Sequence, residues 1–158
     1  MAGGVAAVRT VRASFPQTSG TLDVPGLDAE VRVLRDDAGV PQVYASTPHD
    51  LFFAQGFVQA QDRFYEMDVR RHLTAGRLSE LFGSDTLEAD KVVRALGWRR
   101  VAEREVAQLD DETQAHLEAF SAGVNAYLRD RSSGDIALEY TLLSLGGLDY
   151  TPEDRSRR

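Results

Sequence analysis

Cysteine is absent from this 158-residue sequence, and its absence removes three kinds of chemistry at once. Without cysteine there is no disulfide framework, no thiolate nucleophile and no zinc–thiolate site, and the redox compartment stays undetermined. Histidine is scarce too: His49, His72 and His116 are the only three, and they fall on different predicted elements with no carboxylate or second histidine at ligand spacing. We therefore predict no metal site and no Ser–His–Asp arrangement, because histidines scattered in this way are usually structural or exposed.

Basic residues are also fewer than acidic ones. Lysine and arginine together number 18 against 25 aspartates and glutamates, which gives a formal net charge of −7 at pH 7. Because phosphate binding depends on positive charge, this balance predicts no nucleic-acid partner. A hydrophobic content of 42% in a chain of this length is enough for one domain with its own core.

Long hydrophobic runs are missing from the amino end. The apolar stretch from Ala2 to Val8 is too short to span a membrane, and it lacks the basic leader and the length of a complete signal peptide. We interpret residues 1–20 as a linker or the remnant of an export or anchor segment, residues 21–154 as the main folded region, and residues 155–158 as an atypical basic tail.

The most regular pattern in the chain lies at residues 47–77. Thr47 is a good N-cap, Pro48 suits the first helical position, and Asp50 can close a capping-box-like pair. Two apolar rows and one polar row then follow helical spacing, and Gly76 supplies a stop. This pattern predicts one long helix buried from several sides. The first row is Phe53, Phe57, Ala60, Phe64 and Met67; the second is Leu51, Ala54, Val58, Tyr65 and Val69; the polar row is Gln55, Gln59, Asp62, Glu66 and Arg70.

Before this helix the sequence alternates with a period of two. Residues 30–33 and 42–45 are predicted to pair as a β-hairpin, with Asp36, Asp37 and Gly39 in the turn. Residues 21–24 are predicted to form a further short strand. A two-stranded ribbon leaves open edges, so it needs a larger sheet to join.

After the long helix the chain stays helical. Short helices are expected at residues 78–82, 85–96 and 98–109, and a stronger one at about 111–130 that begins at Asp110 and Asp111. Its predicted buried residues are Leu117, Phe120, Val124, Tyr127 and Leu128, with small residues at Ala119, Ala122, Gly123 and Ala126 for a close helix contact. A short turn or helix and then a loop are expected from residue 135. The fold class is therefore α+β, mainly α, with an amino-terminal β-hairpin followed by a helical body.

One charged cluster within the long helix has two interpretations. Paired carboxylates could serve acid–base catalysis, but Glu66 precedes Arg70 by four residues, which favours a helix ion pair and a structural network. A structural role is also favoured for Gly56, which is predicted to let a neighbouring backbone or side chain pack close to the helix. The aromatic side chains of the helix are predicted to belong to the core and not to line an acyl pocket. The cluster comprises Asp62, Arg63, Glu66, Asp68, Arg70 and Arg71.

Several of these stretches resemble the opening of the α chain of the penicillin acylase family of N-terminal-nucleophile amidohydrolases. They are GVPQVYA at 39–45, DLFFAQGFVQAQDRFYEMDVRR at 50–71, GRLSELFG at 76–83, Asp90, Arg94, and FSAGVNAYL at 120–128, in the family's order. The resemblance runs from about Gly39 to about Asp154. It implies a fragment of the four-layer αββα fold.

The resemblance also implies a function. In this family an exported precursor excises a spacer and becomes an α chain and a β chain, and the nucleophile is the serine at the new amino terminus of the β chain. It cleaves the amide bond between an acyl side chain and an amine, in the β-lactam antibiotic, acyl-homoserine lactone or lipopeptide class. The implied partner is the β chain of the same precursor, and the implied location is extracellular, periplasmic or in the cell envelope.

After Tyr150 this sequence departs from the pattern of the family. TPED at 151–154 resembles the lead-in to a helix that lines the acyl pocket, with the calcium ligand of some members further on, but here Arg155 to Arg158 follow. We therefore expect no catalytic residue, unknown substrate-binding residues and no calcium ligand in this sequence, and no activity from it alone. The alternatives are a non-catalytic helical interaction module, the remnant of a truncated gene, or a self-contained enzyme using Asp62, Glu66 and Arg70.

Overall fold

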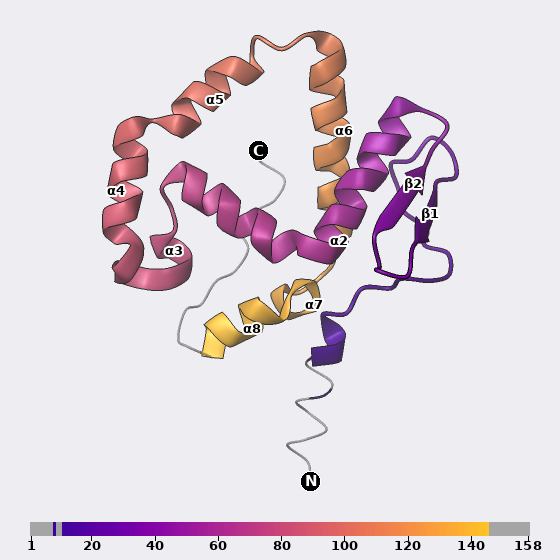
Figure 1. The fold of residues 1–158 in the computed structure, drawn as a ribbon, viewed down its shortest axis with the longest axis horizontal. Coiled ribbons are helices and arrows are strands. Elements are labelled where there is room, and N and C mark those ends of the chain that lie inside the picture. Colours follow the sequence, from indigo (N-terminus) through magenta and orange to yellow (C-terminus); the bar gives the residue numbers. More distant parts are fainter. Residues whose placement is uncertain (1–7, 9–10, 146–158) are drawn as a thin grey trace. The chain divides into compact units, whose positions relative to one another are not determined.

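The computed structural model describes residue 8 and residues 11–145, and the chain divides into two compact units. The hairpin unit contains residues 16–62 and 110–131. The helical unit contains residues 63–109 and 132–145, together with the described residues up to 15. Each unit is described by itself below, and the ribbon is shown in Figure 1.

The hairpin unit contains the predicted β-hairpin. Strands β1 (Arg32–Arg35) and β2 (Pro41–Tyr44) pair antiparallel with Val33 opposite Val43. Asp36 closes the turn, because its Oδ1 accepts hydrogen bonds from the backbone N–H groups of Ala38 at 3.0 Å and Val40 at 2.8 Å. Within the described residues the sheet has only these two strands.

The prediction of a short strand at residues 21–24 is wrong, because these residues have no regular secondary structure. A strand needs a neighbour to take up its backbone hydrogen bonds. Neither edge of the hairpin accepts this segment, and Leu22 remains 42% exposed.

Helix α2 (Pro48–Ala75) begins and ends as the sequence predicts. The Thr47 hydroxyl accepts a hydrogen bond from the N–H of Asp50 at 3.1 Å. At the other end Gly76 has a φ of +66°, its N–H donates to Leu73, and the N–H of Arg77 donates to His72 at 2.8 Å. This pair of bonds is a Schellman motif, which requires a left-handed residue at the position of Gly76.

The predicted single helix is nevertheless interrupted. Arg63 has non-helical angles, φ −146° and ψ 29°, so α2 consists of two helical parts joined at a kink. Residues 48–62 belong to the hairpin unit and residues from Arg63 onwards to the helical unit. The periodicity could not reveal the kink, because apolar residues recur at helical spacing on both sides of it.

Helix α6 (Asp111–Leu128) lies alongside the first part of α2 in the hairpin unit (Figure 1). The Asp110 carboxylate caps it by accepting from the N–H of Thr113 at 2.8 Å. The two backbones touch where a side chain is missing: a β-carbon at Gly56 would collide with the Phe120 carbonyl, and one at Gly123 would collide with the Phe53 carbonyl. The close contact predicted from small residues is confirmed.

This close contact also corrects the predicted buried face of α6. Ala119, Gly123, Tyr127 and Leu128 are buried, but Leu117 is 46% exposed, and Phe120 and Val124 are half-buried. Because the backbones approach along small residues, the larger apolar side chains beside them are only partly covered.

The helical unit consists of short elements that follow the second part of α2. They are α3 (Ser79–Phe82), the 3-10 turn η1 (Gly83–Thr86), α4 (Leu87–Leu96), α5 (Trp98–Val106), α7 (Ser133–Ile136) and α8 (Leu138–Leu145). The predicted helices are confirmed, although α5 ends before Leu109. The loop expected after α8 lies outside the described residues.

Burial supports most of the predicted pattern on α2. Phe53, Ala54, Val58, Ala60 and Phe64 are buried, and the whole polar row is exposed. Leu51, from the second apolar row, is 40% exposed and does not belong to the core. None of the described helices is long and apolar enough to cross a membrane.

Candidate functional site

Asp68 is the centre of a buried polar cluster in the helical unit. Its carboxylate is buried and accepts hydrogen bonds from Arg71 Nε at 3.1 Å, Arg71 Nη2 at 2.6 Å and the Tyr140 hydroxyl at 2.8 Å. His72 Nδ1 lies 3.3 Å from the same carboxylate and 2.8 Å from the Asp68 carbonyl oxygen, and Nε2 lies 3.8 Å from Glu80 Oε2. The cluster joins α2, α3 and α8.

Two pKa values in this cluster move in the directions expected of an ion pair. Burial alone would raise the pKa of Asp68, but hydrogen bonds from His72, Arg71 and Tyr140 outweigh it and hold that pKa far below 3.8. Burial alone would lower the pKa of His72, but its contacts with Asp68 outweigh it and raise that pKa above 6.5. Both residues therefore favour their charged forms.

This pair resembles the base and orienting carboxylate of a hydrolase, but its surroundings favour a structural role. His72 is 2% exposed and Asp68 is 1% exposed, so a substrate has no approach to either. Both ring nitrogens of His72 already face carboxylate oxygens. A general base has to reach the proton that it removes, and here it would have to displace its own partners.

The expectation that no carboxylate lies at ligand spacing from a histidine is therefore wrong. Asp68 precedes His72 by four residues, and helical residues four apart share a face. The spacing was visible in the sequence. Tyr140 had no such signal, because 72 residues separate it from Asp68.

The charged cluster expected on the long helix separates into independent pairs. Asp62 pairs with Arg35 of β1 through bonds of 2.8 and 2.9 Å, and Glu66 lies 3.5 Å from Arg63. Glu66 does not pair with Arg70, so that prediction is wrong. Each carboxylate has a different arginine, which supports structural roles over a shared acid–base site.

Asp90 and Arg94 of α4 form a second polar cluster in the helical unit, around the turn after α2. The buried Asp90 carboxylate accepts from the N–H groups of Leu78 and Ser79, both at 2.8 Å. Burial alone would raise the pKa of Asp90, but the bonds from Ser79 and Leu78 lower it. Arg94 Nε donates to the Gly76 carbonyl at 2.7 Å. These contacts fix the start of α3.

Asp50 has the same kind of role in the hairpin unit. Its carboxylate is fully buried and accepts from the N–H groups of Asp28 at 2.8 Å and Ala29 at 3.1 Å. The bond from the Asp28 N–H is the largest cause of its lowered pKa. The capping-box-like pair is thus half confirmed, because Thr47 accepts from Asp50 while the carboxylate holds the preceding loop.

Asp28, His49 and Asp50 are the one group of potential metal ligands that the described residues bring together, with donor atoms within 4.8 Å of one another. The calcium ion that the resemblance associates with some relatives does not fit this group. Calcium prefers six to eight oxygen ligands, whereas one donor here is an imidazole nitrogen and both Asp50 oxygens already accept N–H bonds.

Serine hydroxyls in the described part of the chain do not meet a histidine base. Ser14 and Ser144 donate to backbone carbonyls, and Ser132 donates to Asp135. The aromatic side chains of α2 pack within their units, with Phe57 edge-on to Tyr127 and Tyr65 edge-on to Tyr140. The core interpretation of these aromatics is therefore favoured over an acyl pocket.

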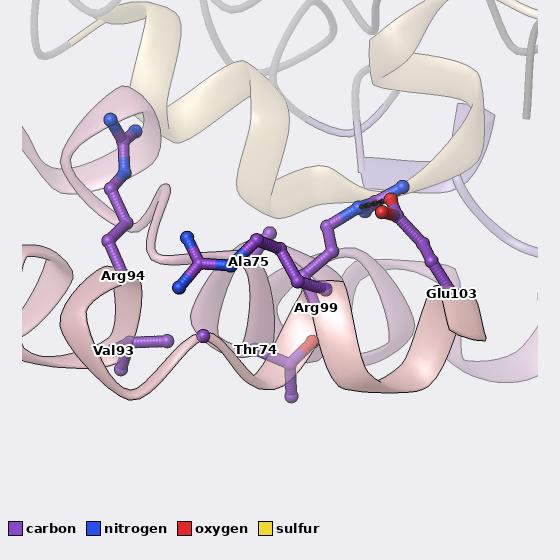
Figure 2. Close-up of a pocket in the computed structure, with 8 residues that line it drawn as sticks. Thr74, Ala75, Val93, Arg94, Arg99 and Glu103 are labelled. Atoms are coloured by element: carbon purple, nitrogen blue, oxygen red, sulfur yellow. Dashed lines mark hydrogen bonds and ion pairs between the residues drawn. The ribbon is translucent and has the colours of Figure 1, made fainter. Parts of the chain in front are cut away.

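A surface pocket of about 290 Å³ lies within the helical unit, between the ends of α2 and α4 and the start of α5 (Figure 2). Its lining is Thr74, Ala75, Val93, Arg94, Gly97, Arg99, Arg100 and Glu103. Figure 2 shows Arg99 paired with Glu103, a contact of 2.9 Å. The pocket contains no aromatic side chain and none of the residues considered above for acid–base chemistry.

The hairpin, the kinked helix and the helical body together match a segment of an N-terminal-nucleophile hydrolase. The structure is similar to the thermostable penicillin G acylase of Alcaligenes faecalis, with a TM-score of 0.66 and 28% identity over 78% of this chain and 64% of that chain. The penicillin amidase family profile matches residues 30–156, and the chain belongs to that family.

Individual relatives support this assignment. Penicillin acylase 2 proenzyme of Pseudomonas sp. (strain SE83) is 43% identical over 84% of this chain, and acyl-homoserine lactone acylase QuiP of Pseudomonas aeruginosa is 38% identical over 78% of it. The chain spans only 17% of the first relative's length and 15% of the second's. The resemblance to the penicillin acylase family is therefore confirmed.

Proposed function

We propose that this chain is the α-chain portion of an amidohydrolase that cleaves the amide bond between an acyl side chain and an amine. The substrate class is that of its relatives, β-lactam antibiotics or acyl-homoserine lactones, with lipopeptides as a further candidate. The family match over residues 30–156 supports the proposal.

The role of the chain itself is to build the scaffold, and one observation carries this conclusion. Three buried carboxylates, Asp50, Asp68 and Asp90, each accept hydrogen bonds that fix a loop or join helices. Buried polar networks that are fully satisfied position the elements around them. None of the three is accessible to a substrate, because all are at most 2% exposed.

A partner chain would then supply the catalytic groups for amide cleavage. The proposed partner is the β chain of the same precursor, whose amino-terminal serine attacks the amide carbonyl with its own α-amino group as base. This chain is inactive alone, and any calcium ion of the complete enzyme is bound outside the described residues. The proposed location, outside the cytoplasm or in the cell envelope, rests on the family resemblance.

The proposal can be tested in a chimeric precursor. The matching segment of the strain SE83 proenzyme, which is 43% identical, would be replaced by that of this chain. We expect the chimera to mature into two chains and to hydrolyse a penicillin or an N-acyl-homoserine lactone, whereas this chain alone produces no turnover of either.

Two variants of the chimera compare the loss of a buried structural carboxylate with the loss of an exposed one. Asp90→Ala should block maturation, because it removes the acceptor of two backbone N–H groups, while Asp85→Ala, at an exposed position, should mature normally. Turnover by this chain alone would refute the proposed inactivity. A folded chimera that neither matures nor hydrolyses would refute the α-chain role.

A further inference from the structure

Helix α5 has one apolar side that stays uncovered. Trp98, Val101, Ala102 and Val106 follow one another at intervals of three, one and four residues, so they share one side of the helix. Trp98 is 51% exposed, Val101 39% and Val106 50%, and Ala102 is exposed as well. We call these four residues the α5 face.

The other sides of α5 are charged. Arg99 pairs with Glu103 at 2.9 Å, and Arg104 Nε donates to the Arg100 carbonyl at 3.3 Å. In a folded protein the apolar side of such an amphipathic helix normally faces the core. No residue of α5 is buried, so the helix has the pattern of a packed helix without the packing in the described part of the chain.

The length of α5 makes a cover for this face necessary. The helix has nine residues, and isolated helices shorter than about 12–15 residues are marginal in water, because helices in proteins draw most of their stability from packing. Gly97, with a φ of +72°, separates α5 from α4, so α5 cannot be stabilised as an extension of that helix. We therefore expect a second surface to pack on the α5 face.

The composition of the α5 face and the charge of the chain favour a protein surface. Trp98 is the only tryptophan of the chain, and tryptophan is among the residues most enriched at the centre of protein interfaces. The formal net charge of −7 repels an anionic membrane. Two copies of the chain can meet through apolar surface, but each carries this charge, which opposes a tight pair.

We propose that the α5 face, with Trp98 as its anchor, docks on the β chain of the same precursor. The proposal rests on the α-chain role proposed above and adds the surface through which this chain holds that partner. The chain spans only 17% of the strain SE83 proenzyme, so most of the polypeptide of that relative has no counterpart here and is available as a cover. In the assembled enzyme the apolar side chains leave water, while Arg99 and Arg104 remain at the polar rim.

Photo-cross-linking in the chimeric precursor tests the docking. The photoreactive residue p-benzoylphenylalanine replaces Trp98, Val106 or Arg104 in three separate chimeras, and mass spectrometry identifies the cross-linked peptides. We expect the first two positions to cross-link to peptides of the β-chain region. Arg104 lies on another side of α5 and should give no such product.

The cross-links can be identified in the unprocessed precursor as well as in the matured enzyme. A precursor that folds without maturing would therefore count against the proposed function alone, because the cross-linked peptides would still decide the docking. Equal yields at Trp98 and Arg104 would overturn the docking proposal. Cross-links only to a second copy of the chain or to lipid, or no cross-links at all, would overturn it too.

Matched variants measure what the α5 face contributes to holding the two chains together. In the matured chimera, Trp98→Gln should speed the separation of the chains in urea about tenfold or more, because aromatic anchors dominate interface energies. Val106→Gln should have a smaller effect in the same direction, and Arg104→Gln should leave the rate unchanged. Equal rates in the Trp98→Gln and Arg104→Gln chimeras would contradict the proposal.

Discussion

At the scale of single residues, buried aspartates hold loops and helices together through the hydrogen bonds that they accept. Asp68 shows the principle most clearly, because its carboxylate accepts bonds from Arg71 and from the Tyr140 hydroxyl while it faces the imidazole of His72. A buried charge is costly unless it is paired and hydrogen-bonded. Removing one of its partners should therefore destabilise the unit more than the same change at the surface.

Tyr140→Phe tests this directly. The substitution keeps the buried ring and removes only the hydroxyl that donates to Asp68 at 2.8 Å. Since hydrogen bonds to charged groups contribute about 1.5–3 kcal/mol, we expect the free energy of unfolding to fall by about that amount. Urea unfolding monitored by circular dichroism measures the change.

The control is Tyr44→Phe. The Tyr44 hydroxyl donates to Gln42 at the exposed surface of the hairpin, so its loss should change the free energy of unfolding by less than about 0.5 kcal/mol. Equal losses in the two variants would show that the hydrogen bond from Tyr140 to Asp68 contributes no more to the free energy of unfolding than an exposed one.

His72 should make the stability depend on pH. Its folded-state pKa is raised above 6.5, so its contribution is complete below about pH 6.5 and is lost as the pH rises through the raised value. Asp68 acts in the opposite direction, because its folded-state pKa is lowered from 3.8 and its contribution is lost as the pH falls below that value. We expect the free energy of unfolding to be greatest between these limits.

Denaturant unfolding across a pH series measures this profile. His72→Gln should remove the decline on the alkaline side, whereas His116→Gln, which lies in the hairpin unit against Phe52, should retain it. A wild-type profile that is flat from pH 6 to pH 9 would contradict the role assigned to His72.

At the scale of elements, the contact between α2 and α6 depends on two glycines. Gly56 and Gly123 each lie against a backbone carbonyl of the other helix, so the two helices meet without intervening side chains. Glycine in a helix costs about 1 kcal/mol relative to alanine, and the close contact offsets that cost.

Gly56→Ala should destabilise the hairpin unit by about 2 kcal/mol or more, because the new β-carbon collides with the Phe120 carbonyl and forces the helices apart. Gln59→Ala, on the exposed face of the same helix, should change stability by less than about 0.5 kcal/mol. Thermal unfolding compares the two. Stabilisation by Gly56→Ala would mean that helix propensity outweighs the contact.

At the scale of the whole molecule, apolar side chains remain uncovered on α4 and α5. Val92, Leu96, Trp98 and Val106 are each at least 50% exposed, and α5 has no buried residue. Exposed apolar surface promotes association and dye binding. We expect the isolated chain to bind a hydrophobic dye and to self-associate.

Sedimentation and dye fluorescence test this expectation. The double variant Val92→Gln with Leu96→Gln should lower both dye binding and association. Lys91→Gln, on the same helix and exposed, should lower neither. A monomer that melts sharply and binds no dye would contradict the expectation.

The pairing of Asp62 with Arg35 belongs to this scale as well, because it joins the hairpin to α2. In the chimeric precursor, Asp62→Asn should reduce folding and self-cleavage more than the chemical step. Maturation is followed by the appearance of two chains and chemistry by turnover per matured enzyme. Normal maturation with lost turnover would reopen a catalytic role for Asp62.

Much of the local structure followed from the sequence. The caps at Thr47, Asp110 and Gly76 and the alternation around Val33 and Val43 act between residues close in the chain, so their patterns could be read directly. The family motifs predicted the assignment for the same reason, since they are continuous stretches of sequence.

The hairpin, most helix limits and the family can be predicted from the amino-acid sequence. The pairing of distant polar groups cannot, because Tyr140 meets Asp68 across 72 residues and Arg35 meets Asp62 across 27. The same holds for the exposure of Leu117, the break of α2 at Arg63 and the arginines that line one pocket. These features depend on how separate elements pack, whereas caps, turns and periodicity depend on residues that are neighbours in the chain.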